Sequence, residues 1–185
     1  MQRLLAAPSD NRRAFDSVSI AIMKTAGEIA ARYLKDHSLV LATAESCTAG
    51  LIASRLADVK GAGAVLEVAF VVYDPKAKQR VLGVKQQTIE RFNLTSEEVA
   101  LEMARGALAN SDADVAVSNT GVTDDTDPDI APGTQCYAWV FRKGLLADEA
   151  FTERKVFEGS RHAIRGASAD HALLRLVEHH RRLGR

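Results

Sequence analysis

Cysteine is scarce in this sequence. Its two cysteines, Cys47 and Cys136, have neither the C-x-x-C spacing nor the histidine partners that mark zinc sites and redox pairs, so neither kind of site is indicated. We expect both to be reduced thiols. Cys47 would serve either as a nucleophile or, as is more common for an unpaired cysteine in an apolar region, as a small core residue.

An excess of charge of one sign is also missing. The chain carries 24 lysines and arginines and 24 aspartates and glutamates, which gives a formal net charge of zero at pH 7. This balance argues against a nucleic-acid surface, a membrane-binding face or an acidic tail. We therefore expect a small-molecule partner, no nucleic-acid or membrane partner, and no cofactor.

Long apolar runs are absent as well. No stretch approaches the roughly 18 residues that span a bilayer, and residues 1–7 lack the apolar region of a secretory signal, so we expect a cytoplasmic protein. With 185 residues, 46% of them hydrophobic, the chain has the composition of one globular domain. We expect a flexible leader over residues 1–15, where no periodicity is found, and a single domain over residues 16–185.

Hydrophobic periodicity and turn residues predict alternating strands and helices. We expect helices over residues 17–37, 48–57, 76–82, 97–108 and 161–182, and strands over residues 39–44, 64–73, 114–118, 134–142 and 148–158. The strand at 64–73 is almost wholly apolar, which favours burial on both faces. The last two strands should form a hairpin, so one of them runs antiparallel. This order predicts an α/β fold, a three-layer α/β/α sandwich around a mixed sheet.

The stretch Thr43–Ile52, with the sequence TAESCTAGLI, leads from an apolar strand into a helix through small hydroxyl-bearing residues. It delivers Ser46 to a helix start, where N–H groups and the helix dipole favour an anion. The plainer interpretation is that Ser46 or Thr48 caps the helix. Residues that follow strands gather at one edge of such a sheet, so this turn, the segment after Tyr73 and the long loop 119–133 should face one cleft.

Four stretches together resemble the CinA C-terminal domain family over about residues 18–182. They are Ala44–Gly50, Tyr73–Val84, Ser96–Ala107 with Thr120-Gly121, and Phe157–Arg165. The resemblance implies a stand-alone nicotinamide mononucleotide deamidase, which hydrolyses the carboxamide to nicotinic acid mononucleotide and ammonia. It also implies a five-stranded, mostly parallel mixed sheet with one antiparallel strand, and a possible homodimer.

The resemblance further implies which residues form the site. Ser46 matches the nucleophilic serine of the family, Tyr73 and Lys78 match its active-site tyrosine and lysine, and Arg161 matches a functional arginine. The substrate-binding set is Glu45, Cys47, Thr48, Gly50, Thr120, Gly121 and Arg161.

Amide hydrolysis through an acyl-enzyme requires a hydroxyl nucleophile, a base and donors for the oxyanion. Lys78 can serve as the base if burial, or a nearby cation such as Arg161, lowers its pKa from about 10.4 toward neutrality. Tyr73 would relay the proton or hold Lys78. N–H groups of residues 47–50 would bind either the oxyanion or a phosphate.

Each of these residues also has a plainer interpretation. Lys78 would be a solvated lysine, Tyr73 would close a strand, and Arg161 would cap its helix or pair with Glu158. Glu45 would orient its neighbours by hydrogen bonds or pair with Arg55.

Other residues suggest structural roles. A metal site at Asp124, Asp125, Asp127 and Asp129 is disfavoured because the spacing of a calcium loop is missing. His179 and His180 should compensate the dipole at the end of the last helix, and Trp139 and Phe141 should be core or interface residues.

The sequence departs from the family pattern at three points, one of which is Glu67-Val68-Ala69-Phe70, where the family has a glycine-containing strand before Tyr73. Ala49-Gly50 replaces paired glycines, and the loop after Gly121 is rich in aspartate where the family has glycine and proline. Extra carboxylates there would repel a phosphate. A second hypothesis therefore stays open, in which the chain is a non-catalytic binding or assembly module that lost activity through its 122–132 loop.

Overall fold

The computed structural model describes residues 24–144 and 147–184. The expected leader and the first residues of the predicted 17–37 helix lie outside these ranges. The helices are α1 (Ala26–Asp36), α2 (Leu51–Ala57), α3 (Pro75–Leu82), α4 (Gln86–Phe92), α5 (Glu97–Ala109) and α6 (Arg161–Leu183), with one 3-10 turn, η1 (Ala62–Ala64). The strands are β1 (Leu41–Glu45), β2 (Leu66–Val71), β3 (Val115–Gly121), β4 (Thr134–Phe141) and β5 (Glu149–Val156). None of the helices in these ranges is both long and apolar enough to cross a bilayer.

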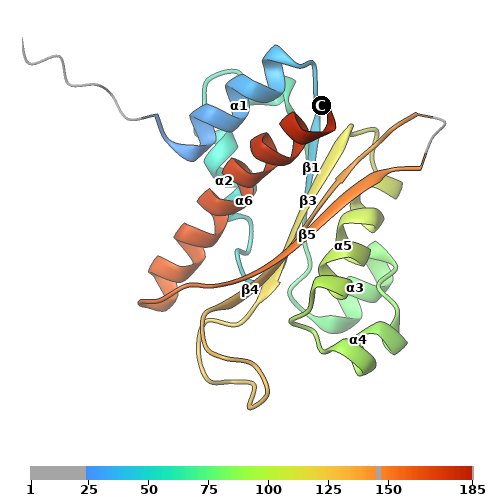
Figure 1. Cartoon of the computed structure of the whole chain (residues 1–185), viewed down its shortest axis with the longest axis vertical. Coiled ribbons are helices and arrows are strands. Elements are labelled where there is room, and N and C mark those ends of the chain that lie inside the picture. Colours follow the sequence, from blue (N-terminus) through green and yellow to red (C-terminus); the bar gives the residue numbers. More distant parts are fainter. Residues whose placement is uncertain (1–23, 145–146, 185) are drawn as a thin grey trace, which may run out of the picture.

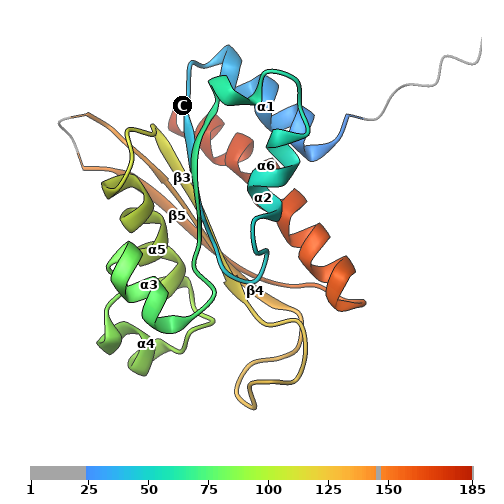
Figure 2. The same ribbon diagram turned by 180° about the vertical axis from the view of Figure 1, so that it is seen from behind.

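The five strands form one mixed sheet in the order β2-β1-β3-β4-β5. β1 pairs in parallel with β2 and β3, whereas β4 is antiparallel to both β3 and β5. Only β4 therefore runs against the other strands, which confirms the predicted hairpin and the mixed, mostly parallel sheet. Helices α1, α2 and α6 cover one face, and α3, α4 and α5 cover the other, so the three-layer architecture is confirmed (Figures 1 and 2).

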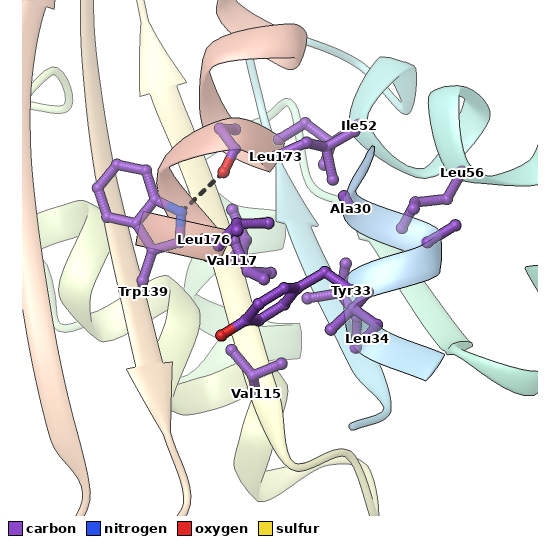
Figure 3. Close-up of a cluster of buried hydrophobic side chains, with 14 of the residues drawn as sticks. Ala30, Tyr33, Leu34, Ile52, Leu56, Val115, Val117, Trp139, Leu173 and Leu176 are labelled. Carbon is purple, nitrogen blue, oxygen red and sulfur yellow. Dashed lines mark hydrogen bonds between the residues drawn. The ribbon is translucent and has the colours of Figure 1, made fainter. Parts of the chain in front are cut away.

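Two apolar cores, one on each face of the sheet, hold the layers together. On the α1/α2/α6 side, Ile52 and Leu173 are fully buried against Val117 of the central strand β3 (Figure 3). The indole N–H of Trp139 donates a 2.9 Å hydrogen bond to the carbonyl of Ala172, so this large aromatic is buried without an unsatisfied donor. Burial of Trp139 and Phe141 confirms that both are core residues.

Two features of the fold differ from the sequence-based prediction. β2 is not buried on both faces, because it is an edge strand in which Glu67, Ala69 and Val71 are exposed and alternate with partly buried residues. The helix α4 was not expected. None of its residues is buried, so its sequence lacks the apolar stripe by which an amphipathic helix is recognised.

The prediction that His179 compensates the dipole of α6 is wrong. Its side chain is 3% exposed and lies between the rings of Trp139 and Phe151, with centroid distances of 4.6 and 4.4 Å. Burial lowers the pKa of His179 to about 4, so the ring is uncharged at neutral pH. Arg181 and Arg182 remain as cations in the last turn.

Candidate active site

Ser46 directly follows β1 at the carboxyl end of the sheet. Its backbone N–H donates a 2.9 Å hydrogen bond to the carbonyl of Asn119 on β3, so the pairing of β1 with β3 extends one residue beyond the end of the strand. The side chain of Ser46 is 7% exposed. The neighbouring strand therefore fixes the backbone that carries the expected nucleophile.

Lys78 reaches Ser46 from the first turns of α3. This helix begins at Pro75, and the carboxylate of Asp74 caps it by accepting hydrogen bonds from two backbone N–H groups, at 2.8 and 3.3 Å. The orientation of α3 exposes Lys76 and buries Lys78, which is 2% exposed. Lys78 is therefore a buried lysine rather than a solvated one, and its Nζ lies 2.9 Å from the Oγ of Ser46.

The amine of Lys78 has three oxygen neighbours. It donates to the carbonyls of Val72 and Tyr73 at 2.9 and 3.0 Å, and its third neighbour is the hydroxyl of Ser46. Two N–H bonds are thus committed to carbonyls. In the neutral amine the remaining tetrahedral position, which faces Ser46, holds the lone pair that can accept the hydroxyl proton.

Burial is the main cause of the altered pKa of Lys78. Desolvation lowers this pKa to about 8, although the nearby carboxylate of Asp74 acts in the opposite direction. Of the two causes considered from the sequence, burial is therefore the one that operates here, and Arg161 is not among the groups that shift this pKa. With a pKa of 8, about a quarter of the amines are neutral at pH 7.5.

Tyr73 contributes to the site through two different groups. Its backbone carbonyl holds Lys78, whereas its hydroxyl accepts a 2.8 Å hydrogen bond from Arg161. The same guanidinium donates to the hydroxyl of Thr123 at 2.7 Å and to the carboxylate of Asp124 at 3.0 Å. Arg161 thus bridges the segment after β2 and the loop after β3, and it pairs with Asp124 rather than with Glu158.

A cavity of about 280 Å³ lies beside these residues. It is lined by Cys47, Tyr73, Gly121, Val122, Thr123, Asp124, Thr126 and Arg161. Ser46 and Lys78 do not line it themselves, but Ser46 is adjacent in sequence to Cys47, and Lys78 is bonded to Tyr73. A larger hollow of about 560 Å³ is lined by residues 57–63 and Leu66, at the opposite end of β2. The smaller cavity is therefore the one next to the Ser46–Lys78 pair.

Glu45 caps the start of α2 with its side chain. Its carboxylate is fully buried and accepts hydrogen bonds from the N–H groups of Ile52 and Ala53, at 3.1 and 3.0 Å. It thereby occupies the start of α2, where the sequence suggested room for an anion. Arg55, its other possible partner, pairs with Asp170 instead.

The turn between β1 and α2 leaves two backbone N–H groups unused. The N–H of Thr48 donates to the side chain of Asn119 at 3.1 Å, so this residue supports the turn and its fully buried side chain does not line the cavity. Among the described residues, the N–H groups of Cys47 and Gly50 have no acceptor. That of Cys47 directly follows the serine, which is a common place for an oxyanion donor.

Thr120 and Gly121 have different roles at the end of β3. The hydroxyl of Thr120 donates to the carbonyl of Leu94 at 2.9 Å and the residue is 3% exposed, so it braces the scaffold. Gly121 lines the cavity, and a Cβ there would lie 2.5 Å from the carbonyl oxygen of Thr134. Any side chain at residue 121 would therefore displace β4.

A buried polar network that the sequence patterns did not predict lies beneath the turn. The side chain of Asn119 donates to Gln135 and Ser168 at 3.0 and 3.2 Å, and the guanidinium of Arg165 donates to the carbonyls of Cys47 and Thr48, both at 2.9 Å. These bonds fix the backbone next to Ser46. One signal was available, since Arg165 lies one helical turn after Arg161 and so shares its face of α6.

The thiol of Cys47 does not have the properties of a nucleophile. It is 4% exposed, and burial raises the pKa of Cys47 above its ordinary value, although a hydrogen bond from Gln135 opposes the shift. Both cysteines are free thiols. Within residues 24–144 and 147–184, no three His, Cys, Asp or Glu side chains are grouped so that they could hold a metal ion.

The fold and the site define an α/β/α protein in which a serine at the end of a strand is hydrogen-bonded to a buried lysine of low pKa. The chain belongs to the CinA family, because residues 23–180 match the model of the CinA C-terminal domain.

The relatives of this chain fall into two groups, of which one is much longer than the chain and the other similar to it in length. A CinA-like protein of Chlorobium limicola is 46% identical over 125 residues, which cover 61% of this chain but 28% of that protein. The chain thus spans less than a third of this relative. The nicotinamide-nucleotide amidohydrolase PncC of Escherichia coli is 37% identical over 142 residues, covering 76% of this chain and 84% of that protein. Among solved structures, the competence or damage-inducible protein of Enterobacter asburiae matches 84% of this chain and 98% of its own, with a TM-score of 0.77 and 32% identity.

Proposed function

We propose that this protein is an amidohydrolase that cleaves the carboxamide of nicotinamide mononucleotide, or of a closely related amide, to a carboxylate and ammonia. The observation that carries the proposal is the 2.9 Å hydrogen bond between Ser46 and Lys78, in which a buried amine with a pKa of about 8 faces a serine hydroxyl. The similarity to the nicotinamide-nucleotide amidohydrolase of Escherichia coli supports the choice of substrate.

The first half of the reaction forms an acyl-enzyme. The neutral amine of Lys78 takes the proton of Ser46 as the Oγ attacks the carboxamide carbon. The N–H of Cys47 stabilises the resulting oxyanion. The ammonium of Lys78 then returns the proton to the departing nitrogen, which leaves as ammonia when the C–N bond breaks.

The second half releases the carboxylate. Lys78, neutral again, takes a proton from a water molecule, whose oxygen attacks the ester carbon. Collapse of this second oxyanion breaks the bond to Ser46, and Lys78 returns the proton to the serine oxygen. Arg161 lies at the cavity and serves as the cation for the substrate phosphate.

The test is the release of ammonia from nicotinamide mononucleotide by the purified protein. Ser46→Ala and Lys78→Ala should each abolish release, because one removes the nucleophile and the other the base. Ser54→Ala and Lys76→Ala are matched controls, since both residues are exposed on neighbouring helices, and both variants should keep full activity. Unchanged release by either site variant would refute the mechanism.

The pairing of Arg161 with Asp124 favours a second candidate function, a non-catalytic binding module. In this case Arg161, the cation expected to bind phosphate, is already paired with a carboxylate of the protein itself, that of Asp124. The module hypothesis requires that the native protein bind a pyridine nucleotide and release no ammonia from any amide tested. Calorimetric titration alongside the ammonia assay separates the two functions.

A further inference from the structure

Asp124 pairs with Arg161, the cation that the proposed function assigns to the substrate phosphate. Its Oδ2 lies 3.0 Å from Nη1 of Arg161, and the hydroxyl of Thr123 contacts both of these groups, at 2.7 Å from Arg161 and 3.3 Å from Asp124. The other terminal nitrogen of Arg161 is bonded to Tyr73. Three of the five N–H donors of Arg161 are thus committed to the protein, and an anion that binds at Nη1 shares or replaces the contact that Asp124 now makes.

The cavity is electrically balanced as a result. Among the residues that line it, Arg161 and Asp124 are the charged ones, so their formal charges cancel. The nearby guanidinium of Arg165 is committed to the carbonyls of Cys47 and Thr48. A phosphate monoester carries close to two negative charges at neutral pH, and this cavity has no surplus positive charge to receive them.

The backbone on either side of Asp124 is anchored, so the carboxylate is not a chance neighbour of Arg161. The N–H of Val122 donates to the carbonyl of Thr134, and the carbonyl of Val122 accepts from the side chain of Gln135, both at 2.9 Å. On the other side, Asn93 donates to the carboxylate of Asp127 at 2.8 Å. These bonds tie the start and middle of the loop to the rest of the fold.

We propose that Asp124 determines substrate specificity by competing with the substrate phosphate for Arg161. The inference rests on the proposed function and narrows its substrate class. Asp124 weakens the preference for a phosphorylated pyridine amide, so the unphosphorylated riboside becomes a comparable substrate. Removing the charge of Asp124 restores the preference for the phosphorylated substrate. This change acts on KM, because the phosphate of the substrate lies away from the reacting amide.

The experiment compares kcat/KM for nicotinamide mononucleotide and nicotinamide riboside. Asp124→Asn keeps the shape of the side chain and removes its charge. It should raise kcat/KM for the nucleotide about three- to tenfold, mainly through KM, since the Arg161–Asp124 pair is half exposed and therefore modest in strength. The value for the riboside should stay within about twofold. Asp125→Asn is the matched control, because it removes an exposed charge from the same loop and should change neither value by more than about twofold.

An unchanged kcat/KM of Asp124→Asn for the nucleotide would overturn the inference, as would either of two other kinetic results. If Asp124→Asn lowers kcat/KM for both substrates, the carboxylate orients Arg161 rather than competing with phosphate. If Asp125→Asn raises the value for the nucleotide as much as Asp124→Asn does, the effect is a general charge effect of the loop. Asp124→Ala repeats the comparison with a side chain that lacks the amide of asparagine. Agreement between the two Asp124 variants excludes an effect of the asparagine side chain itself.

A binding measurement keeps failure of the inference distinct from failure of the proposed function. If the native protein hydrolyses neither amide, the proposed function fails, and inorganic phosphate becomes the probe. Asp124→Asn should then bind phosphate about three- to tenfold more tightly than the native protein in calorimetry, and Arg161→Ala should abolish binding. Equal affinities in the native protein and in Asp124→Asn would overturn the inference independently of activity.

Discussion

The burial of Lys78 makes the stability of the protein depend on pH in a way that can be calculated. The folded pKa is about 8 and the ordinary value is 10.5. Between these values the unfolded chain holds a proton on this amine that the folded chain has lost, so the stability of the native protein rises with pH through this window. Below pH 8 the folded protein bears the full cost of a buried ammonium, about 3.4 kcal/mol from the shift of 2.5 units.

Lys78→Met isolates this effect, because methionine has a similar unbranched side chain and does not titrate. We expect the free energy of unfolding of the native protein, minus that of the variant, to increase by about 2.5 kcal/mol from pH 7 to pH 10. Urea unfolding followed by circular dichroism at a series of pH values measures it. Other groups titrate in the same range, but they are common to both proteins and cancel in the difference.

Lys76→Met is the control for this measurement. Lys76 lies on the same helix with its side chain exposed, so its replacement gives the baseline for a lysine that is not buried. If the difference for Lys78→Met is flat from pH 7 to pH 10, or no larger than this baseline, the Lys78 amine titrates normally in the folded protein. The reasoning that makes Lys78 a base would then be refuted.

Three further variants test the structure around the site, each by urea unfolding. Glu45→Ala should lose about 2 kcal/mol, because the N–H groups of Ile52 and Ala53 lose a buried charged acceptor; no loss would contradict its role as a cap. Ala49→Gly should gain about 0.5–1 kcal/mol, since Ala49 has φ of 50°, where a side chain is strained; a loss would argue against that conformation. The folded pKa of His179 is about 4 and its ordinary value is 6.5, so protons bind the unfolded chain first and the native protein should lose about 2 kcal/mol of stability between pH 7.5 and pH 5. His179→Leu should remove this loss, and an unchanged loss would refute the reasoning.

The layers of the fold could be predicted because they depend on local patterns. The apolar strand before Ser46 and the capped helix beginning near Ser96 each carry their own periodicity and turn residues, and both elements form as expected. The exposed face of β2 could not be predicted. An apolar run of its length suits either an edge strand or a central strand, and only the order of strands in the sheet decides between them.

The site could be predicted only in part. The family resemblance indicated Ser46 and Lys78, whereas the local sequence alone does not distinguish Lys78 from Lys76. Their different burial depends on how α3 lies against the end of β1, which is a tertiary feature. The same holds for the contact between Asp124 and Arg161, which joins residues far apart in the chain. Sequence patterns therefore indicated which groups are present, whereas packing determines which are charged, buried or already occupied.

In the proposed mechanism, Ser46 becomes covalently acylated with the help of Lys78. The most direct test of this step is mass spectrometry of the protein quenched during turnover of nicotinamide mononucleotide. We expect an adduct equal in mass to the substrate less ammonia, located on the peptide that contains Ser46 and absent from Ser46→Ala. An adduct on Cys47, or ammonia release from Ser46→Ala at the native rate, would contradict the mechanism.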